Sequence, residues 1–493
     1  LVVQPNPFSD GETIVVPRTN AAIEEEPGIG LAEVRDGTSL SQVIAGLNAL
    51  GVSLVPVNPD LRAAELRYLV EHSELVLAVA IANRQQDLLT AGAPVVIGPG
   101  DVIPQAVNAK QAGIINQDTE AALLYTSGTT GLPKGCVLTN DYHLTAGQWY
   151  ADLGGLIDIR RGKERLYNPL PLFHMNAAVV SLGCMLLTGG CLIIPDRFHP
   201  RSWWQEVCDT SATIIHYLGV VPPMLLNQPV SDAEKKHVVR FGVGAGVEPE
   251  LHGVFEERYG FPLLEIWGMT ETGRVLGVRD EPRMIDTRAF GRPSTGFEAM
   301  VVDEHGQEVP RGVQGELLVR SSADDPRKGF FAGYLSNEDA TEEAWAGGWF
   351  NTGDTVTQDE TGMLFFVDRK KNIIRRSGEN IAAAEVEAVL QSHEAVGQVA
   401  VISVSDDLRE EEVMACIVLM EGIEESDALA RALFDFTFDR LAYFKPPGWI
   451  LFLDKLPTTG TQKIQKAQIF SPDTDPLQAK GIRDFRSLKK KSR

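Results

Sequence analysis

The chain has 493 residues and a formal net charge of −22 at neutral pH, with 44% hydrophobic and 23% charged residues. At roughly 100–200 residues per domain, this length predicts two or more packed units of a globular protein. The acidic balance argues against a general binder of nucleic acid or anionic membranes, because a basic surface recruits such partners. Any anionic ligand must therefore be held by local positive groups.

The amino-terminal stretch LVVQPNPFSDGE has neither a basic n-region nor a long apolar h-region, so no secretory signal is expected there. The five cysteines show no CxxC spacing, and their number is odd. This usage favours reduced thiols over disulfides or a zinc site. The predicted location is therefore the cytoplasm.

Apolar strand-like runs alternate with helical patterns in the first two thirds of the chain. GVSLVPVNP precedes LRAAELRYLVEHS, and ATIIHYLGVVP precedes another helical stretch. This alternation predicts a layered α/β body. After Pro282, short strands punctuated by Gly and Asp predict an antiparallel sheet, and near Asp368 the pattern becomes a compact α+β one.

The longest apolar run, 177–194, approaches the ~20 residues that a membrane span needs. Gly189 and Gly190 interrupt the run and Pro195 closes it. The pattern predicts a buried helix, a glycine stop and a short strand, and a membrane span is the less favoured alternative.

The stretch YTSGTTGLPKG, residues 125–135, combines three glycines, hydroxyl side chains and one lysine. Glycine lets a ligand approach main-chain N–H groups, so the stretch suits a phosphate cradle. It does not match the Walker A pattern, because Pro133 stands where the second glycine should be. The strand-like runs AALLY and CVLT flank it, and Thr139 and Asn140 offer N-caps for a following helix. A flexible surface turn is the alternative.

Six further stretches accompany this loop in the order PLPLFHMNA (169–177), VGAGVEP (243–249), IWGMTET (266–272), GWFNTGD (348–354), VDRKKNIIRRSGENIAAAEVE (367–387) and LPTTGTQKIQK (456–466). Each resembles a motif of the ANL superfamily of adenylate-forming enzymes, in family order. Within it, the chain is most similar to the acyl-CoA synthetases, the AMP-dependent synthetase/ligase family. The family's early motifs are not recognised in the first ~50 residues, which makes missing segments there plausible.

The resemblance implies an α/β fold with a large N-terminal domain of layered α/β subdomains plus a β-barrel-like subdomain, and a small mobile α+β C-terminal domain. The implied boundaries are 1–368 for the N-terminal domain, 369–371 for a hinge and 372–493 for the C-terminal domain. Lys371 would stand at the pivot of the hinge. In the family the small domain rotates between the two half-reactions, which is a form of hinge motion.

The implied reaction activates a carboxylate with ATP, forming an acyl-adenylate and pyrophosphate, and then passes the acyl group to CoA with release of AMP. Negative charge develops on the phosphates, so cations and N–H donors must be placed in advance. The implied phosphate loop comprises Thr126, Ser127, Gly128, Thr129, Thr130, Gly131 and Lys134. Glu271 would hold Mg²⁺, and Thr270 beside it is also implied to be a catalytic residue. Lys463 would be the adenylation catalyst, although Gln462 replaces the glycine that often precedes it. Without the motif match, Lys463 would be interpreted as a solvated surface charge.

The nucleoside and CoA sites also carry over by resemblance. The implied adenine and ribose residues are Gly246, Val247, Glu248, Trp267, Gly268, Asp354 and Arg369. Trp267 stands where the family usually has Tyr and still offers a flat face for stacking. Without the other motifs, Asp354 would read as a turn residue and Trp267 as core. Arg375, Ser377 and Gly378 would approach the CoA channel; the alternative for this basic stretch is a solvated face.

His174 lies in the stretch LFHMNA, which has the histidine of acyl-CoA synthetases. Amino-acid-activating domains usually carry an aspartate in the region after this motif instead. His174 would lie where the acyl and CoA pockets meet and orient or gate the carboxylate, whereas a buried core histidine is the alternative. The implied acyl-pocket residues are Asn176, Leu218, Gly219, Val243, Gly244, Ala245, Met269 and Thr272. Their mixture of apolar and small polar groups leaves the acid open. The stretches RRSGENIAAAEVE and TGTQKIQK resemble those of ligases related to the carnitine/crotonobetaine type, which favours a small or medium acid.

The expected partners are therefore a carboxylic acid, ATP and CoA, with Mg²⁺ as cofactor and neither nucleic acid nor a membrane span; a homodimer is possible. Two rival classes stay open. One is a stand-alone adenylation enzyme that loads an acyl group onto a carrier-protein thiol. The other is a non-catalytic binding protein on the same fold, which the retention of Lys134, Glu271 and Lys463 disfavours.

Overall fold

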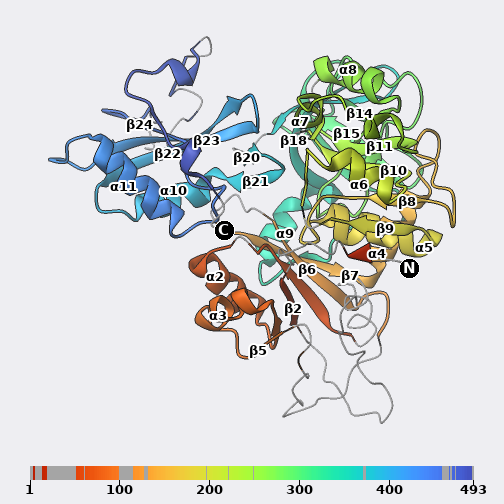
Figure 1. Cartoon of the computed structure of the whole chain (residues 1–493), viewed down its shortest axis with the longest axis horizontal. Coiled ribbons are helices and arrows are strands. Elements are labelled where there is room, and N and C mark those ends of the chain that lie inside the picture. Colours follow the sequence, from red (N-terminus) through yellow and green to blue (C-terminus); the bar gives the residue numbers. More distant parts are fainter. Residues whose placement is uncertain are drawn as a thin grey trace. The chain divides into compact units, whose positions relative to one another are not determined.

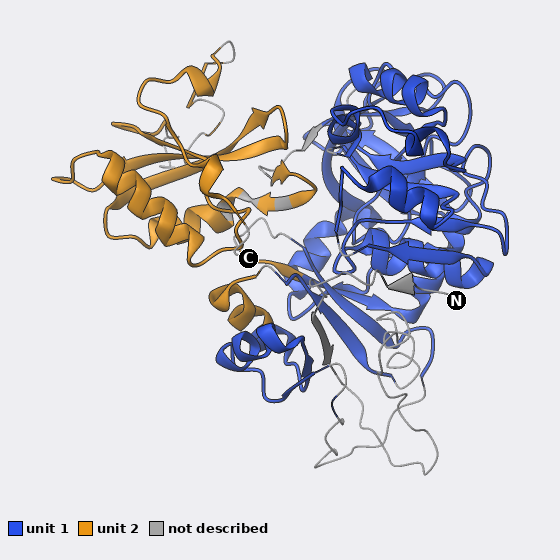
Figure 2. Cartoon of the chain, in the orientation of Figure 1, with its two compact units in different colours: residues 1–59, 70–126, 135–370 blue, residues 60–69, 127–134, 371–493 orange. Residues whose placement is uncertain are grey.

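The structure is a computed structural model of the whole chain (Figure 1). It describes residues 51–59, 61–98, 101, 115–126, 132–195, 197–219, 221–247, 249–369, 373–457, 466, 469–471 and 474–490, with the backbone alone at 4–5, 14–18, 368, 369, 373, 380, 382 and 384. Two compact units make up the chain (Figure 2). Unit 1 comprises 1–59, 70–126 and 135–370, and unit 2 comprises 60–69, 127–134 and 371–493. The break after Lys370 falls inside 369–371; that this segment acts as a hinge stays a prediction.

A mostly parallel seven-stranded sheet forms the centre of unit 1, with strand order β1-β9-β8-β10-β11-β12-β13. Only β13 runs antiparallel to its neighbour. The strands are β1 Gln4–Pro5, β8 Arg165–Tyr167, β9 Cys191–Ile194, β10 Ile214–Leu218, β11 Phe241–Ala245, β12 Leu263–Trp267 and β13 Leu276–Gly277. This arrangement confirms the predicted α/β body, because parallel strands need helical crossovers.

A second seven-stranded sheet has the order β17-β7-β6-β3-β2-β4-β5. Its strands are β2 Ile14–Arg18, β3 Ser53–Val57, β4 Ala78–Val79, β5 Val96–Ile97, β6 Glu120–Thr126, β7 Lys134–Thr139 and β17 Gly333–Tyr334. Strands β6 and β7 flank the phosphate-loop motif, as the sequence predicts. Thr139 then caps the next helix, since its hydroxyl accepts a hydrogen bond from the Tyr142 N–H at 3.2 Å.

Helices connect these strands. They are α2 Ala63–Ser73, α3 Ala82–Thr90, α4 Asn140–Ala151, a π-helix Asn176–Ser181, α5 Leu182–Thr188, α6 Trp203–Asp209, α7 Val221–Leu226, α8 Pro249–Tyr259 and α9 Glu338–Ala344. Helices α4 and α5 meet at two glycines: a Cβ on Gly147 would lie 2.6 Å from the backbone of Gly183. A side chain at this crossing would push the helices apart.

The apolar run 177–194 folds as predicted. The π-helix and α5 are largely buried, Gly189 ends α5 in the left-handed conformation at φ +71°, and β9 follows. No helix in the described part of the chain combines the length and apolar character needed to cross a bilayer. All five cysteines are free of disulfides, as expected.

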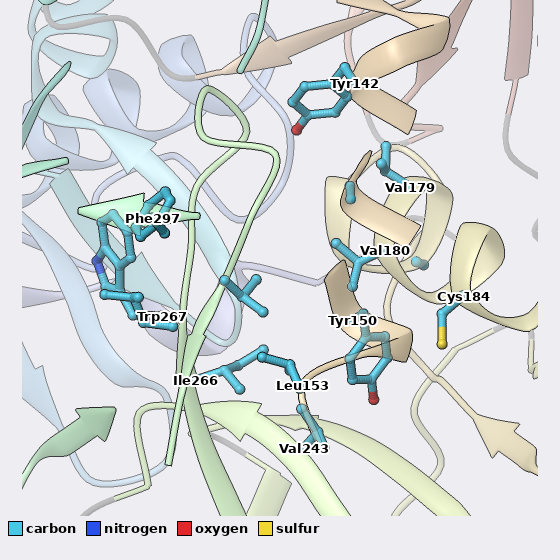
Figure 3. Packing of buried hydrophobic residues seen from close by; sticks show 14 of the residues in the cluster. Tyr142, Tyr150, Leu153, Val179, Val180, Cys184, Val243, Ile266, Trp267 and Phe297 are labelled. Carbon is cyan, nitrogen blue, oxygen red and sulfur yellow. The ribbon is translucent and has the colours of Figure 1, made fainter. Parts of the chain in front are cut away.

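The core of unit 1 lies between the parallel sheet and these helices. Figure 3 shows Tyr150 of α4, Val179 and Val180 of the π-helix, and Val243 and Ile266 of the sheet in this cluster. Each of these five side chains is at most 7% exposed. Packing of this kind fixes where the sheet's carboxyl edge lies relative to the π-helix.

A five-stranded antiparallel sheet completes unit 1, in the order β14-β19-β18-β16-β15. Its strands are β14 Ala289–Gly291, β15 Phe297–Val302, β16 Gly315–Ser321, β18 Phe350–Gln358 and β19 Leu364–Arg369. The predicted change to antiparallel sheet after Pro282 is therefore confirmed.

Unit 2 has the α+β character that the sequence predicts. Its elements are β20 Ile373–Arg376, β21 Glu379–Ala382, α10 Ala383–Gln391, β22 Val396–Asp406, β23 Glu410–Leu419, α11 Asp427–Phe438, β24 Trp449–Phe452 and β25 Arg483–Asp484. Val386 and Leu390 of α10 are fully buried against the sheet, and Val389 is partly buried beside them, as the helical spacing predicts. Residues 60–69 also belong to this unit: Glu65 lies 2.6 Å from the buried Lys445.

A buried carboxylate holds the carboxyl end of this unit. Glu412 of β23 is fully buried and accepts hydrogen bonds from Arg376 Nε at 2.7 Å, from the Val413 N–H at 2.9 Å and from Lys489 Nζ. Both cations are themselves at most 4% exposed. The single carboxylate therefore compensates two buried positive groups.

We expect Glu412→Gln to destabilise unit 2 by about 3–5 kcal/mol, because it leaves buried cations without a counter-charge. Urea unfolding of the full chain should be followed at pH 6, since burial lowers the pKa of Lys489 to about 7. The matched control is Glu425→Gln, whose carboxylate is 60% exposed and 3.7 Å from Arg483; it should cost less than about 1 kcal/mol. Equal urea midpoints for Glu412→Gln and Glu425→Gln would contradict the role of Glu412 in compensating the two buried cations.

Candidate functional site

The predicted nucleotide and acyl residues follow three neighbouring parallel strands. Leu218 ends β10, Ala245 ends β11 and Trp267 ends β12. The register pairs Leu218 with Ala245, and Gly244 with Glu265 two positions before the end of β12. Ligands of open α/β sheets bind beyond this carboxyl edge. Gly219, Gly246 and Val247, and the segment 268–272, therefore begin at one edge of the sheet.

Glu265 of β12 forms hydrogen bonds with residues of β10 and of the turn after β11. The carboxylate accepts a hydrogen bond from the Tyr217 hydroxyl at 2.6 Å and another from the Gly246 N–H at 2.7 Å. Gly246 has a φ of +87°, which an ordinary side chain rarely adopts. Burial raises the pKa of Glu265 to about 7, although both hydrogen bonds oppose this shift. Glu265 thus fixes the turn that carries the predicted adenine wall.

Two of the predicted adenine and ribose residues contact each other directly. The Trp267 indole N–H donates to Asp354 Oδ2 at 2.8 Å, although the two residues are 87 positions apart. Trp267 is 7% exposed and belongs to the core cluster in Figure 3. Asp354 lies on β18, where its backbone pairs with that of Arg369 on β19. The structure therefore brings a ring, a carboxylate and the Arg369 backbone together.

Glu271 is the predicted metal ligand, and it is 6% exposed. One of its carboxylate oxygens accepts a hydrogen bond from the Tyr334 hydroxyl at 3.0 Å, and its carbonyl accepts one from the Phe331 N–H at 3.0 Å. The neighbouring Thr270 carbonyl accepts a hydrogen bond from the Tyr142 hydroxyl at 2.6 Å. Both residues are therefore held by aromatic hydroxyls from other elements.

A buried polar network lies behind Asn176. The Asn176 side-chain oxygen accepts from His216 Nδ1 at 2.7 Å and from Asn168 Nδ2 at 2.9 Å. His216 Nδ1 therefore carries the proton, and Nε2 accepts from the Tyr150 hydroxyl at 2.7 Å. Burial lowers the pKa of His216 to about 3, so the ring is neutral at physiological pH.

The remaining predicted acyl-pocket residues divide into two groups. Leu218, Ala245 and Met269 are half-buried at the sheet edge, and Asn176 is half-buried at the start of the π-helix. Val243 and Thr272 are completely buried, and the Thr272 hydroxyl lies 2.9 Å from the Arg274 carbonyl, to which it donates. Gly219 and Gly244 are buried too, and a Cβ on Gly244 would lie 2.3 Å from the Tyr217 carbonyl. The four buried residues Val243, Thr272, Gly219 and Gly244 therefore lie in the core and support the sheet edge from there.

Several predicted residues fall outside the described part of the chain. They are Ser127, Gly128, Thr129, Thr130, Gly131, Glu248, Lys371, Lys463 and the side chain of Arg369. Thr126 and Lys134, at the two ends of the loop, are half-buried on β6 and β7, and His174 is half-buried beside Phe173. Gly268 is exposed and Val247 is buried.

The predicted CoA residues lie in unit 2 at the turn between β20 and β21. The Arg375 N–H donates to Glu411 at 2.5 Å, and the Ser377 N–H donates to the Arg409 carbonyl at 3.0 Å. Ser377 and Gly378 both have positive φ, at +50° and +85°. The buried pair of Arg376 and Glu412 anchors this turn to β23.

Sequence reasoning missed several residues that hold the predicted site, among them Tyr142, Tyr217, Glu265, His216 and Tyr334. A signal for two of them was available, since His216 and Glu265 each interrupt the otherwise apolar strands IIHYL and LLEIW. A polar residue inside a buried strand needs a hydrogen-bond partner. Which partner it has depends on the neighbouring strands.

Two family models cover most of the chain. The model described as AMP-binding enzyme matches residues 39–335, and the model described as AMP-binding enzyme C-terminal domain matches residues 385–463. A third model, of the flagellar P-ring protein, matches residues 1–57. That match covers the stretch in which the early ANL motifs are not recognised.

Curated relatives align over most of the chain. A crotonobetaine/carnitine–CoA ligase of Proteus mirabilis is 31% identical over 453 residues, covering 86% of this chain and 84% of that protein. A sulfoacetate–CoA ligase of Cupriavidus necator is 30% identical over 452 residues, covering 88% and 86%.

Solved structures show the same similarity. An o-succinylbenzoate CoA synthetase from Bacillus subtilis superposes with a TM-score of 0.76 at 26% identity, over 87% of this chain and 85% of that chain. A malonyl-CoA ligase gives 0.71 at 27% identity, over 85% and 89%. The AMP-binding match alone spans more than half of the chain. The chain therefore belongs to the AMP-binding enzyme family and is an AMP-forming acyl-CoA synthetase with the ANL fold.

Proposed function

We propose that this ligase activates a small or medium carboxylic acid at the carboxyl edge of the parallel sheet, using the residues gathered there. The observation that carries the assignment is the pairing of Trp267 with Asp354 at the edge that also bears Gly246 and Glu271. The names of the relatives support the acid class, since crotonobetaine, carnitine and sulfoacetate are small molecules.

The nucleoside would lie between the Gly246 turn and the end of β12. Glu265 orients the Gly246 turn, Trp267 would supply an aromatic surface beside the adenine, and Asp354 would accept hydrogen bonds from the ribose hydroxyls. The half-buried Lys134 and the loop before it would bind the β- and γ-phosphates. Backbone N–H groups and a lysine suit that charge.

Mg²⁺ is the cofactor that fits Glu271. Its carboxylate is a hard oxygen donor, oriented by the Tyr334 hydroxyl at 3.0 Å. In the described ranges, no group of three or more His, Cys, Asp or Glu side chains could hold a metal ion. This suits an ion that takes one carboxylate from the protein and its other ligands from substrate phosphates and water. When bound, the ion would neutralise charge that develops on the phosphates.

The acyl group would lie against the half-buried Asn176, Leu218, Ala245 and Met269. His216 orients Asn176 through a neutral ring, so this wall carries no charge from the histidine. His174 would act on the carboxylate, and Lys463 would stabilise charge at the α-phosphate. Arg375, Ser377 and Gly378 would guide CoA in the second half-reaction, after movement about Lys371.

A panel of carboxylic acids tests the substrate class. The chain should be incubated with ATP, Mg²⁺ and each acid, with and without CoA, while pyrophosphate and acyl-CoA are followed. We expect acid-dependent pyrophosphate release and a thioester with CoA for small or medium acids. Pyrophosphate without any CoA thioester would favour a carrier-protein acceptor, and no pyrophosphate with any acid would favour the binding-protein alternative.

Lys463→Ala should lower the adenylation rate by about 10²–10³-fold, because a positive group aimed at developing charge is lost. Thioester formation from a supplied acyl-adenylate should be unchanged. The matched control is Lys466→Ala, three positions further along, whose Nζ lies 2.7 Å from Glu387; it should spare adenylation. Equal loss of adenylation and of thioester formation in Lys463→Ala would contradict the assignment of Lys463 to adenylation alone.

Glu265→Gln should flatten the pH dependence of stability. The folded carboxyl keeps its proton up to about pH 7, whereas in the unfolded chain it loses the proton near 4.5. Between these values the folded state binds more protons, so this contribution to the free energy of unfolding falls as pH rises, by at most about 3 kcal/mol. Denaturant unfolding at pH 5 and 7.5 measures the difference between variant and wild type. The exposed Glu257→Gln is the control, and parallel curves for Glu265→Gln and wild type would contradict the prediction.

A further inference from the structure

A groove in unit 1 lies apart from the residues predicted for ATP and the acyl group. Its volume is about 870 Å³, within the range of small-molecule sites. The C-terminal half of α4, the segment after β12 and the loops beside β15 and β16 line it. Every lining residue is described, and none belongs to the predicted nucleotide, acyl or CoA sets.

Arg274 in the wall of this groove is a buried cation that has no counter-ion among the residues that the structure describes. It is 6% exposed, and its Nη1 donates to the Lys328 carbonyl at 2.8 Å. Its Nε is buried and has no hydrogen-bond partner. No carboxylate in the described part of the chain forms a salt bridge with Arg274, although Asp141 is close enough to influence its charge. A buried charge without compensation is costly.

Two aromatic rings compensate this cation in part. The guanidinium carbon lies 5.5 Å from the centroid of Trp149 and 5.6 Å from that of Phe330. Cation–π contacts offset only part of the free-energy cost of desolvating an ion. Burial lowers the pKa of Arg274 to about 10, so the side chain is still charged at neutral pH. The remaining deficit can be met by an anion in the groove.

The rest of the wall suits an anion with an apolar part. Lys328 and Arg279 add positive charge, and Trp149 and Leu187 add apolar surface. The wall also contains a carboxylate, Asp152, but it already accepts a hydrogen bond from Gln148 Nε2 at 2.6 Å. Positive groups thus outnumber negative ones in a chain whose overall charge is −22.

We propose that this groove binds a small organic anion, with Arg274 and Lys328 holding the anionic group and Trp149 the apolar body. Two kinds of molecule carry an anionic group of this chemistry. The anion is either a second anionic group of the acid that the enzyme activates or a separate effector molecule. The binding itself does not depend on the proposed function, so it can be measured on the protein without ATP.

Calorimetry with naphthalene-2-sulfonate tests the proposal, because this anion cannot be adenylated. We expect saturable binding to the full chain, at least tenfold weaker binding of the neutral naphthalene-2-sulfonamide, and quenching of tryptophan fluorescence. Arg274→Met should weaken sulfonate binding at least tenfold, and Lys328→Gln about threefold. Trp149→Phe should remove most of the quenching and leave the calorimetric affinity within about twofold.

Lys328→Gln guards against misfolding of Arg274→Met, because Lys328 is exposed whereas Arg274 also supports the Lys328 backbone. Arg311→Gln is the matched control: this arginine is in the same unit, is 40% exposed and does not line the groove. Its affinity should equal that of the wild type. The proposal is overturned by an absence of binding, by equal affinities for sulfonate and sulfonamide, or by unchanged affinity in both Arg274→Met and Lys328→Gln.

Competition distinguishes the two kinds of molecule once a productive acid is known. If that acid displaces naphthalene-2-sulfonate and the Arg274→Met variant raises its KM, the groove holds part of the substrate. If the sulfonate stays bound at saturating acid, the groove is an effector site. Either result supports an organic-anion site, whereas failure of the acid panel alone leaves the binding result intact.

Discussion

The parallel register of β10, β11 and β12 is the constraint on which the site depends. These strands end at one edge of the sheet, and each is followed directly by residues that are predicted to take part in the ligase reaction. Helices α4 and α5 approach through Gly147 and Gly183, and the core between helices and sheet holds that edge in place. The site is thus built from short segments whose positions are set by strands rather than by long loops.

Buried polar residues connect those segments. Glu265 ties β10 to the Gly246 turn, His216 ties Asn176 to α4, and Glu412 anchors the predicted CoA turn of unit 2. Each would be costly alone in a core, and each has its hydrogen bonds satisfied. Their shared effect is to fix the backbone next to residues that are predicted to bind the substrates. Arg274 contrasts with them, since its partners within the described ranges are aromatic faces and one carbonyl rather than a carboxylate.

Much of the fold could be predicted from local patterns. The strands on either side of the phosphate loop, the Thr139 cap, the helix that ends at Gly189 and the antiparallel region after Pro282 all follow from neighbouring residues. Hydrophobic period, capping side chains and glycine conformations act over a few positions, so they can be read without knowing the fold. The reaction class followed from seven motifs in order.

The sequence by itself determined the secondary structure of these segments, the family and the residues to which its chemistry points. Only the tertiary structure decided which residues hold them: Tyr334 orients Glu271, and Glu265 orients Gly246. It also leaves the buried Arg274 Nε without a hydrogen-bond partner in the part of the chain that is described. Glu271 and Tyr334 are 63 positions apart, and Gly246, just after β11, is 19 positions from Glu265 on β12. Hydrogen bonds and charge compensation depend on distance in space, and no local pattern specifies which distant residues the sheet brings together.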